Sequence, residues 1–239
     1  MLKKIIFAIL ISSFLFSCTK KTNQDGKSSL NIQLEYGVKT ASLIFDSLMY
    51  VNAANNQYSV TNLEYIISNI QLTNNHNEII KYNNIVYVDA RKAMYNSFVL
   101  NDVPYGSYKS ISFNIGLNQE LNISNSLPST TEFINMAWPD MMGGGYHFLK
   151  LEGNVLDSLS QSGYAMHLGT DAGLVTCVID SEYLISTPNS NFKLHMDVNE
   201  WFENPQNYDL IVDGNYTMGN MMLMSRIAKN GYNVFNLIQ

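Results

Sequence analysis

Histidine is the residue type with the clearest chemical potential in this sequence, because only four histidines occur among its 239 residues. A neutral imidazole is the commonest side-chain ligand for transition metals in proteins. In two predicted strands, 163–169 and 192–198, the apolar residues alternate along one face, which leaves His167 and His195 on the opposite faces. Both positions suit a metal ligand in a shallow cleft, and both equally suit a solvated surface histidine.

The other two histidines are less informative. His147 shares a face with Leu149 but stands between Tyr146 and Phe148, so alternation does not say whether its face is buried. His76 lies in an asparagine-rich turn, where we expect it to be solvated. The spacing alone therefore offers the histidines of the two later strands as candidate metal ligands.

Familiar signatures of catalysis are missing from the sequence. It contains no G-x-S-x-G elbow, no P-loop, no H-E-x-x-H motif and no C-x-x-C pair. Asp197 and Asn199 begin a pattern like that of a calcium loop, but Trp201 stands where the third oxygen ligand belongs. Cys177 lies in an apolar strand and is expected to pack as a small buried thiol. No nucleophile and base can be named, so we expect a binding protein and not an enzyme.

The start of the chain predicts export. Two lysines precede an apolar run over 5–16 that is too short to span a bilayer, which is typical of a signal peptide. A small residue then precedes Cys18, the arrangement that lipoprotein signal peptidases cleave after the cysteine is acylated. We predict a lipoprotein signal peptide at 1–17 and a polar tether at 18–29 that begins with the lipidated Cys18; an ordinary signal peptide with an incidental cysteine is the alternative. The protein is then expected in the cell envelope, lipid-anchored to a membrane and facing the periplasm or the cell surface.

The composition limits domains and partners. Hydrophobic residues make up 46% of the chain, which is enough to fill the core of one domain over 30–239. The formal net charge is −6, and removal of 1–17 takes away two lysines and no acid, which leaves −8. Such a chain lacks the basic surface that nucleic-acid binding needs. With Cys18 lipidated, Cys177 has no partner for an intrachain disulfide.

Alternation of apolar and polar residues dominates the chain and predicts many short strands. The segments 63–72 and 79–88 flank an asparagine-rich turn and are predicted to form a hairpin. Helical spacing appears at 129–139, which opens with a capping-box pattern, and at 217–229, which a following Asn-Gly pair is expected to end. We predict an all-β fold, a mostly antiparallel β-sandwich or open barrel with one or two short helices. Further strands are expected at 30–36, 111–115, 146–155, 163–169, 174–179 and 191–199.

Six segments of the chain resemble the MbnP-like copper-binding family, whose members are exported and include many lipoproteins of the Bacteroidetes type. They follow the family's order and rough spacing across nearly the whole mature chain. The segments are VTNLEYIISNIQL at 60–72, VPYGSY at 103–108, FNIG at 113–116, MAW at 136–138, GYHFLKLEG at 145–153 and MHLG at 166–169.

The resemblance implies a β-rich domain that holds copper outside the cytoplasm. In characterised relatives, histidines bind the metal together with a kynurenine made by oxidising a tryptophan, and a di-haem enzyme related to cytochrome c peroxidases is the implied oxidising partner. In this chain, the resemblance implies His167 as the first copper ligand and His195 as its partner from a neighbouring strand. Trp138 is the implied site of oxidation, with Trp201 as the alternative, and Met136 offers a nearby thioether.

The chain departs from the family pattern in two places. Tyr36 stands where many relatives carry a histidine in the first strand, and Trp138 is followed by Pro139 where relatives often show two tryptophans close together. Met141 and Met142 could add thioether sulfur, although methionines are also simple core filler. The resemblance favours copper binding; the alternative is a metal-free surface binding or accessory lipoprotein of the same fold that contacts glycan or protein.

Overall fold

The computed structural model describes residues 26–158 and 160–238, so the predicted signal peptide, Cys18 and most of the predicted tether lie outside the described residues. The first strand starts at Lys27, inside the segment predicted as tether. The strands are β1 (Lys27–Val38), β2 (Ala41–Ser42), β3 (Tyr50–Val51), β4 (Gln57–Tyr58), β5 (Asn62–Asn74), β6 (Ile79–Tyr82), β7 (Val86–Asp89), β8 (Ser97–Pro104), β9 (Gly106–Ile115), β10 (His147–Asp157), β11 (Ser160–Gly169), β12 (Val175–Ile185), β13 (Asn189–Asp197) and β14 (Phe235–Ile238).

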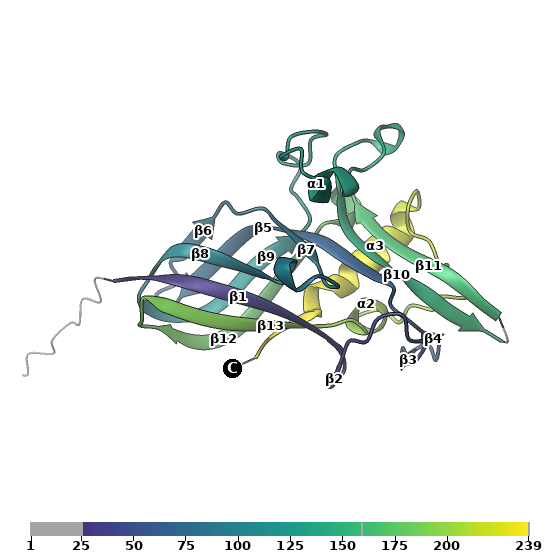
Figure 1. Ribbon diagram of the computed structural model, residues 1–239, viewed down its shortest axis with the longest axis horizontal. Helices are drawn as coiled ribbons and strands as arrows, with labels where there is room; N and C mark the ends of the chain where they lie inside the picture. The colour runs from purple at the N-terminus through teal and green to yellow at the C-terminus, as the bar shows by residue number, and fades with distance from the viewer. Residues whose placement is uncertain (1–25, 159, 239) are drawn as a thin grey trace, which may run out of the picture.

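These strands form two sheets that curl around a common core (Figure 1). In the smaller sheet the order is β14-β13-β1-β2, and β8 also pairs with β1. In the larger sheet the order is β12-β9-β5-β10-β4-β3, with β11 paired to β10 and with β6 and β7 paired to β5. Among the strand pairs of the described residues, β1 and β13 alone run parallel. The predicted all-β fold, an open barrel of mostly antiparallel strands, is therefore confirmed.

Aromatic side chains join the two sheets across the core. Along β1, apolar residues from Leu30 onward alternate toward the interior, as the sequence predicted. The hydroxyl of Tyr36 on β1 lies 3.0 Å from the hydroxyl of Tyr65 on β5. Phe235 of β14 packs against Tyr65 and, edge to face, against Phe113 of β9 with ring centroids 5.2 Å apart. The hairpin predicted around the asparagine-rich turn is also present, since β6 and β7 both pair with β5.

Three α-helices and four short 3-10 turns accompany the strands of the described chain. The predicted helix that opens with a capping-box pattern is present but ends early, because Ala137 leaves the helical path to form a β-bridge with Tyr146. The helices are α1 (Thr131–Asn135), α2 (Glu200–Glu203) and α3 (Met221–Asn230), and the 3-10 turns are η1 (Ala93–Tyr95), η2 (Asp140–Met142), η3 (Asp171–Gly173) and η4 (Gly231–Asn233).

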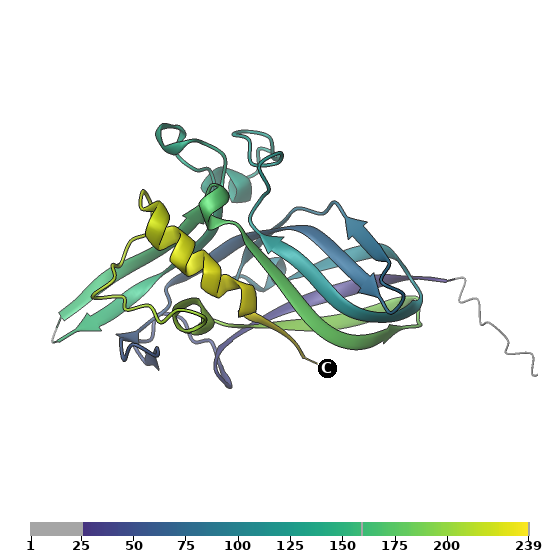
Figure 2. The same cartoon turned by 180° about the vertical axis from the view of Figure 1, so that it is seen from behind.

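The last helix also differs from its prediction at both ends. α3 starts after Asn220, whose side chain accepts a hydrogen bond of 3.2 Å from the backbone N–H of Leu223. It ends at Asn230 as predicted, but Gly231 keeps a right-handed φ of −60° and is not a left-handed cap. Glycine is needed there for space, because a Cβ on Gly231 would lie 2.6 Å from Cζ3 of Trp201. α3 lies against β11 on the face seen in Figure 2.

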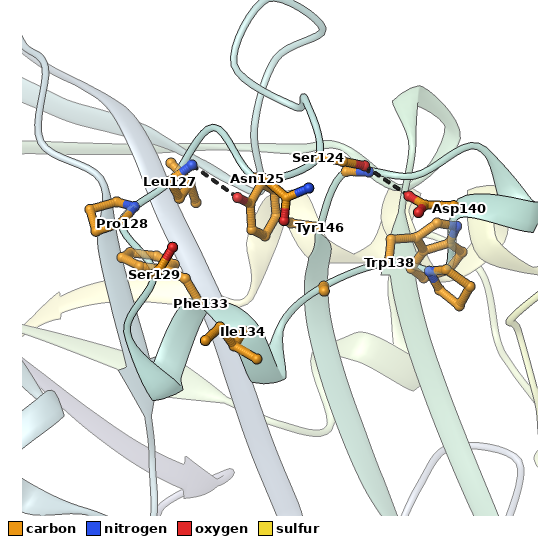
Figure 3. Close-up of a pocket in the computed structure, with 13 residues that line it drawn as sticks. Ser124, Asn125, Leu127, Pro128, Ser129, Phe133, Ile134, Trp138, Asp140 and Tyr146 are labelled. Carbon is orange, nitrogen blue, oxygen red and sulfur yellow. Dashed lines mark hydrogen bonds between the residues drawn. The ribbon is translucent and has the colours of Figure 1, made fainter.

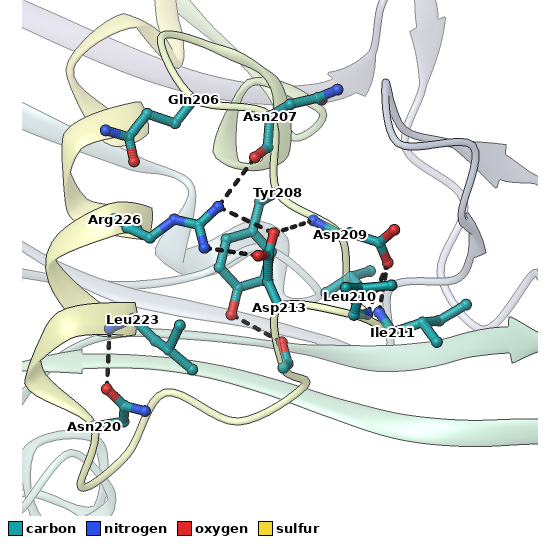
Figure 4. Close-up of polar contacts among 12 residues, drawn as sticks. Gln206, Asn207, Tyr208, Asp209, Leu210, Ile211, Asp213, Asn220, Leu223 and Arg226 are labelled. Atoms are coloured by element: carbon teal, nitrogen blue, oxygen red, sulfur yellow. Dashed lines mark hydrogen bonds and ion pairs between the residues drawn. The ribbon is translucent and has the colours of Figure 1, made fainter.

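Polar contacts tie the loop between α2 and α3 to α3 and to itself (Figure 4). Arg226 of α3 makes a bidentate contact with Asp213, with donor to acceptor distances of 2.8 and 3.0 Å. The carboxylate of Asp213 also accepts the backbone N–H of Asp209 at 2.9 Å, and the hydroxyl of Tyr208 donates to the carbonyl of Gly214 at 2.8 Å. The loop is therefore held at several points.

No helix in the described residues is long and apolar enough to cross a bilayer.

Replacing Gly153 on β10 by alanine should destabilise the fold, because the new Cβ would lie 1.8 Å from the carbonyl oxygen of Ser59. A backbone atom cannot rotate away, so we expect the free energy of unfolding to fall by about 3 kcal/mol or more. Gly163, on the adjacent β11, is a matched control, since its Cβ would find its nearest neighbour, the hydroxyl of Tyr216, at 3.7 Å. Gly163→Ala should change stability by less than about 1 kcal/mol. Urea denaturation measures both, and equal losses would contradict the predicted contact.

Candidate metal centre

A β-bulge places His147 beside His167 on the hairpin of β10 and β11. Along most of this hairpin the register is regular, with Lys150 opposite His167, but between His147 and Leu149 the register shifts by one residue. His147 consequently stands opposite Gly169 and joins the face that carries His167 and Lys150. The two imidazole rings lie edge to face, with centroids 5.1 Å apart and planes at 86°.

Hydrogen bonds to one carbonyl oxygen fix the ring of His147. The backbone N–H of His147 donates to the carbonyl oxygen of Met136 at 2.6 Å, and Nδ1 of the ring lies 3.2 Å from the same oxygen. Because a carbonyl oxygen only accepts, this bond assigns the ring proton to Nδ1. Nε2 of His147 therefore keeps its lone pair, and the ring is 7% exposed.

A carboxylate fixes the ring of His167 through the other ring nitrogen, Nε2. Nε2 of His167 lies 2.7 Å from Oε1 of Glu152. This hydrogen bond lowers the pKa of Glu152, so the carboxylate is ionised at neutral pH and accepts the ring proton. In the neutral imidazole of His167 the lone pair is then on Nδ1. The hydroxyl of Thr217 donates to the backbone carbonyl of His167 at 2.6 Å, which holds the strand from the other side.

The two rings together form a pair of nitrogen donors. Each ring has one nitrogen hydrogen-bonded to an acceptor and one nitrogen with a free lone pair, which is the usual condition of metal-ligating histidines. Within residues 26–158 and 160–238, no three His, Cys, Asp or Glu side chains gather as a ready-made metal site. Two imidazoles, with the nearby carboxylate of Glu152 already hydrogen-bonded to His167, fit a low-coordinate copper ion better than zinc, which is usually bound by four ligands in a tetrahedron.

The surroundings keep His147 neutral. Burial lowers the pKa of His147 to about 4, and the positive charge of Lys150 acts in the same direction. The charge of Lys150 is partly balanced by Glu64, since a carboxylate oxygen of Glu64 lies 3.7 Å from its Nζ. The Nζ of Lys150 also donates a hydrogen bond to the carbonyl of Asn135. The imidazole of His147 is therefore available as a ligand throughout the physiological pH range.

Trp138 lies next to the two imidazoles and contacts His147. Its ring packs edge to face on His147 with centroids 4.7 Å apart, and it is 3% exposed. Its Nε1 donates to the carbonyl of Met142 at 3.2 Å. The indole can lie this close to β11 because residue 169 is glycine; a Cβ on Gly169 would be 2.6 Å from Cε3 of Trp138.

A pocket of about 310 Å³ adjoins the indole (Figure 3). Phe133, Trp138 and Tyr146 contribute rings to its wall, and Ser124 and Asp140, which are hydrogen-bonded to each other at 3.1 Å, contribute polar groups. A small molecule in this pocket would meet Trp138 before it met the buried imidazole of His147.

The structure does not bring His195 to this group. As predicted, His195 is off the apolar face of its strand, but that strand is β13 of the smaller sheet, where His195 stands opposite Glu35 of β1. It lines a separate surface hollow with Tyr36 and Ile238. The imidazole that the structure places beside His167 is that of His147. Alternation identifies the face of a strand but not the sheet to which the strand belongs.

The remaining predicted residues are divided between the site and the core. Met136 reaches the site through its backbone carbonyl, which holds His147, and its side chain is fully buried. Trp201 lies on α2, is fully buried, and packs on Gly231, so Trp138 is the tryptophan next to the imidazoles. Cys177 is buried as predicted, with its thiol 3.4 Å from the carbonyl of Gly231.

The residue that sequence reasoning did not select as a ligand is His147. Its phase by strict alternation is that of Leu149, and only the bulge reverses it. The glycines before His147 and the glycine opposite it are the available signals, since such residues mark bulges and close backbone approach.

The metal-free protein should lose stability as the pH falls from about 6.5 to about 4. In the unfolded chain a histidine takes up a proton near pH 6.5, whereas the pKa of folded His147 is about 4. Below pH 6.5 the unfolded state therefore binds more protons, and the free energy of unfolding decreases by up to about 3 kcal/mol at pH 4. Urea denaturation at several pH values in this window measures the effect.

The matched control for this experiment is His147→Gln, which cannot titrate. Its stability should depend less on pH than that of the wild type, because the contribution of Glu152, whose pKa is lowered on folding, begins near the ordinary pKa of glutamate and is common to both proteins. Parallel pH profiles for the two proteins between pH 6.5 and 4.5 would show that His147 is not shifted as described.

Comparisons with known proteins agree with this fold. The MbnP family model matches residues 27–222 of the chain. No curated protein matches it. Among solved structures, MbnP from Methylosinus trichosporium is similar, with a TM-score of 0.55 over 74% of this chain and 78% of that chain at 13% sequence identity. At this identity the likeness shows the fold alone. Because the family match covers most of its length, this chain belongs to the MbnP family.

Proposed function

We propose that this protein is a lipid-anchored protein of the cell envelope that binds copper as Cu(I) between His147 and His167, and that it is a binding protein and not an enzyme. The observation that carries the proposal is the pair of imidazoles 5.1 Å apart, each with one nitrogen held by an acceptor and one nitrogen free. Copper binding is also what the resemblance to the MbnP-like family implies. Imidazole is a good ligand for copper, and two such donors suit the low coordination number of Cu(I).

Trp138 is the residue that we propose to be oxidised to kynurenine, by a di-haem partner enzyme of the kind the family resemblance implies. Its ring contact with His147, at 4.7 Å between centroids, supports this choice over Trp201, which lies in the core against Gly231. Copper binding by the two imidazoles does not depend on this modification.

The alternative function, a metal-free surface that contacts glycan, has less support. Such a surface would need exposed tyrosines clustered together. Instead many tyrosines are buried in the core, and Tyr58 and Tyr164, for example, pack edge to face with centroids 6.2 Å apart. Exposed Tyr216 and Tyr232 remain, one in the loop before α3 and one in η4 after it.

Copper titration tests the proposed ligands. Purified protein should take up one equivalent of Cu(I) in competition with a chromophoric chelator under anaerobic conditions. His147→Ala and His167→Ala should each abolish this high-affinity uptake, because a single imidazole leaves the ion with one donor. His195→Ala and His76→Ala should retain it, since neither residue is part of the pair. Circular dichroism of each variant establishes that it is folded.

A milder variant separates the acceptor from the ligand. Glu152→Gln keeps a side chain of similar shape but removes the charge that holds the proton on Nε2 of His167. Copper affinity should fall by about 10- to 100-fold, as is usual when an outer-shell partner of a histidine ligand is changed. Unchanged uptake in both His147→Ala and His167→Ala, or loss of uptake in His195→Ala alone, would refute the proposed site.

Lipid anchoring is tested at Cys18. In the native host the protein should fractionate with membranes and incorporate labelled fatty acid, because the acylated cysteine is its proposed anchor. Cys18→Ser should abolish the incorporation of label and shift the protein away from the membrane fraction. A Cys18→Ser protein that still sediments with membranes would show that another part of the chain holds it there.

A further inference from the structure

Two Met-Met pairs that are far apart in the sequence are both exposed, and the segments that carry them contact each other. Met141 and Met142 belong to η2, and Met221 and Met222 begin α3. Their exposed fractions are 97%, 36%, 65% and 70%. Methionine is normally buried as flexible core filler, so four exposed methionines on two adjoining segments are unusual.

Contacts connect the segments that carry the two pairs to the candidate metal centre. The carbonyl of Met142 accepts the indole N–H of Trp138, whose ring packs on His147. A Cβ on Gly219 would lie 3.3 Å from the methyl carbon of Met142, so η2 and the segment leading into α3 touch each other. That segment is attached to β11, because the hydroxyl of Thr217 donates to the carbonyl of His167. Figures 1 and 2 show the N-terminal end of α3 on the same side of the molecule as the loops above α1.

The two exposed methionines of α3 are not part of the core. α3 buries Leu223, Met224 and Ile227, which follow Met221 and Met222 in the sequence and cover β11. The helix is fixed by its Asn220 cap and by the contact between Arg226 and Asp213, so the two exposed side chains start from defined positions (Figure 4). Each methionine side chain has three rotatable bonds, which lets several sulfurs converge on one ion.

We propose that Met141, Met142, Met221 and Met222 form a thioether surface that captures Cu(I) and delivers it to His147 and His167. The inference rests on the proposed copper function. Thioether sulfur is a soft ligand that selects Cu(I) over hard cations such as Mg²⁺ or Ca²⁺. Asp140, the acid of η2, is hydrogen-bonded to Ser124 at 3.1 Å, and its carboxylate is a hard ligand that does not favour a soft ion. The surface therefore adds selection for Cu(I) at the entrance, before the ion reaches the buried imidazole.

Methyl resonances of methionine provide a direct test. The full-length protein is labelled with [methyl-¹³C]methionine and titrated anaerobically with Cu(I) supplied as a weak chelate. The resonances of the four methionines of the thioether surface should shift as copper is added. Met49 and Met94, which are 50% and 75% exposed on other segments, serve as matched controls and should not shift.

Two variants separate this inference from the proposed function. In His147→Ala/His167→Ala, high-affinity uptake should be lost while the four methyl shifts persist at higher Cu(I) concentration. In the variant with all four methionines changed to leucine, the imidazoles should still bind one equivalent, but transfer from the chelate should be slower than in the wild type and in Met94→Leu. Loading of the imidazoles without any shift of the four methyl groups, or an unchanged transfer rate in the leucine variant, would overturn the inference. Methyl shifts without high-affinity uptake by the wild-type protein would instead overturn the imidazole site alone.

Discussion

The bulge between His147 and Leu149 is the constraint on which the candidate metal centre depends. In an unbroken antiparallel ladder, side chains alternate strictly, and His147 would share the face of Leu149, away from His167. One extra residue on β10 reverses the phase of His147 and leaves the following residues in regular register. The carbonyl of Met136 stabilises this arrangement, since it accepts both the backbone N–H and the ring Nδ1–H of His147. A single acceptor thus holds the bulge and orients the ring.

The two acceptors of the site are matched to the burial of their histidines. His147 is almost fully buried and pairs with a neutral carbonyl, whereas the side chain of His167 is 17% exposed and pairs with the carboxylate of Glu152, which is 34% exposed. Burying a carboxylate next to His147 would carry a large desolvation cost without a full counter-charge. Because the charged carboxylate of Glu152 lies at the more exposed of the two histidines, both rings keep a defined tautomer at a modest electrostatic cost.

Much of the fold, and half of the imidazole pair, follow from the sequence. Alternation located β1, β5, β10, β11 and β13 because one face of each strand is buried, and it placed His167 off the apolar face correctly. It could not identify His147, whose phase is set by a local bulge, nor exclude His195, since the sheet to which a strand belongs depends on pairing between distant segments such as β1 and β13. Helix boundaries failed for similar reasons: Ala137 left its predicted helix to pair with Tyr146.

The departure at Tyr36 from the family pattern does not weaken the site on the hairpin. Tyr36 lines the same hollow as His195, and its hydroxyl is hydrogen-bonded to Tyr65 and to Asn96, each at 3.0 Å. A histidine at position 36 would therefore have been a neighbour of His195 and not of His167. Its replacement by a tyrosine that joins the two sheets leaves His195 without that potential partner. The copper site that we propose is the pair of imidazoles on the hairpin, where hydrogen bonds to Met136 and Glu152 set both ring tautomers.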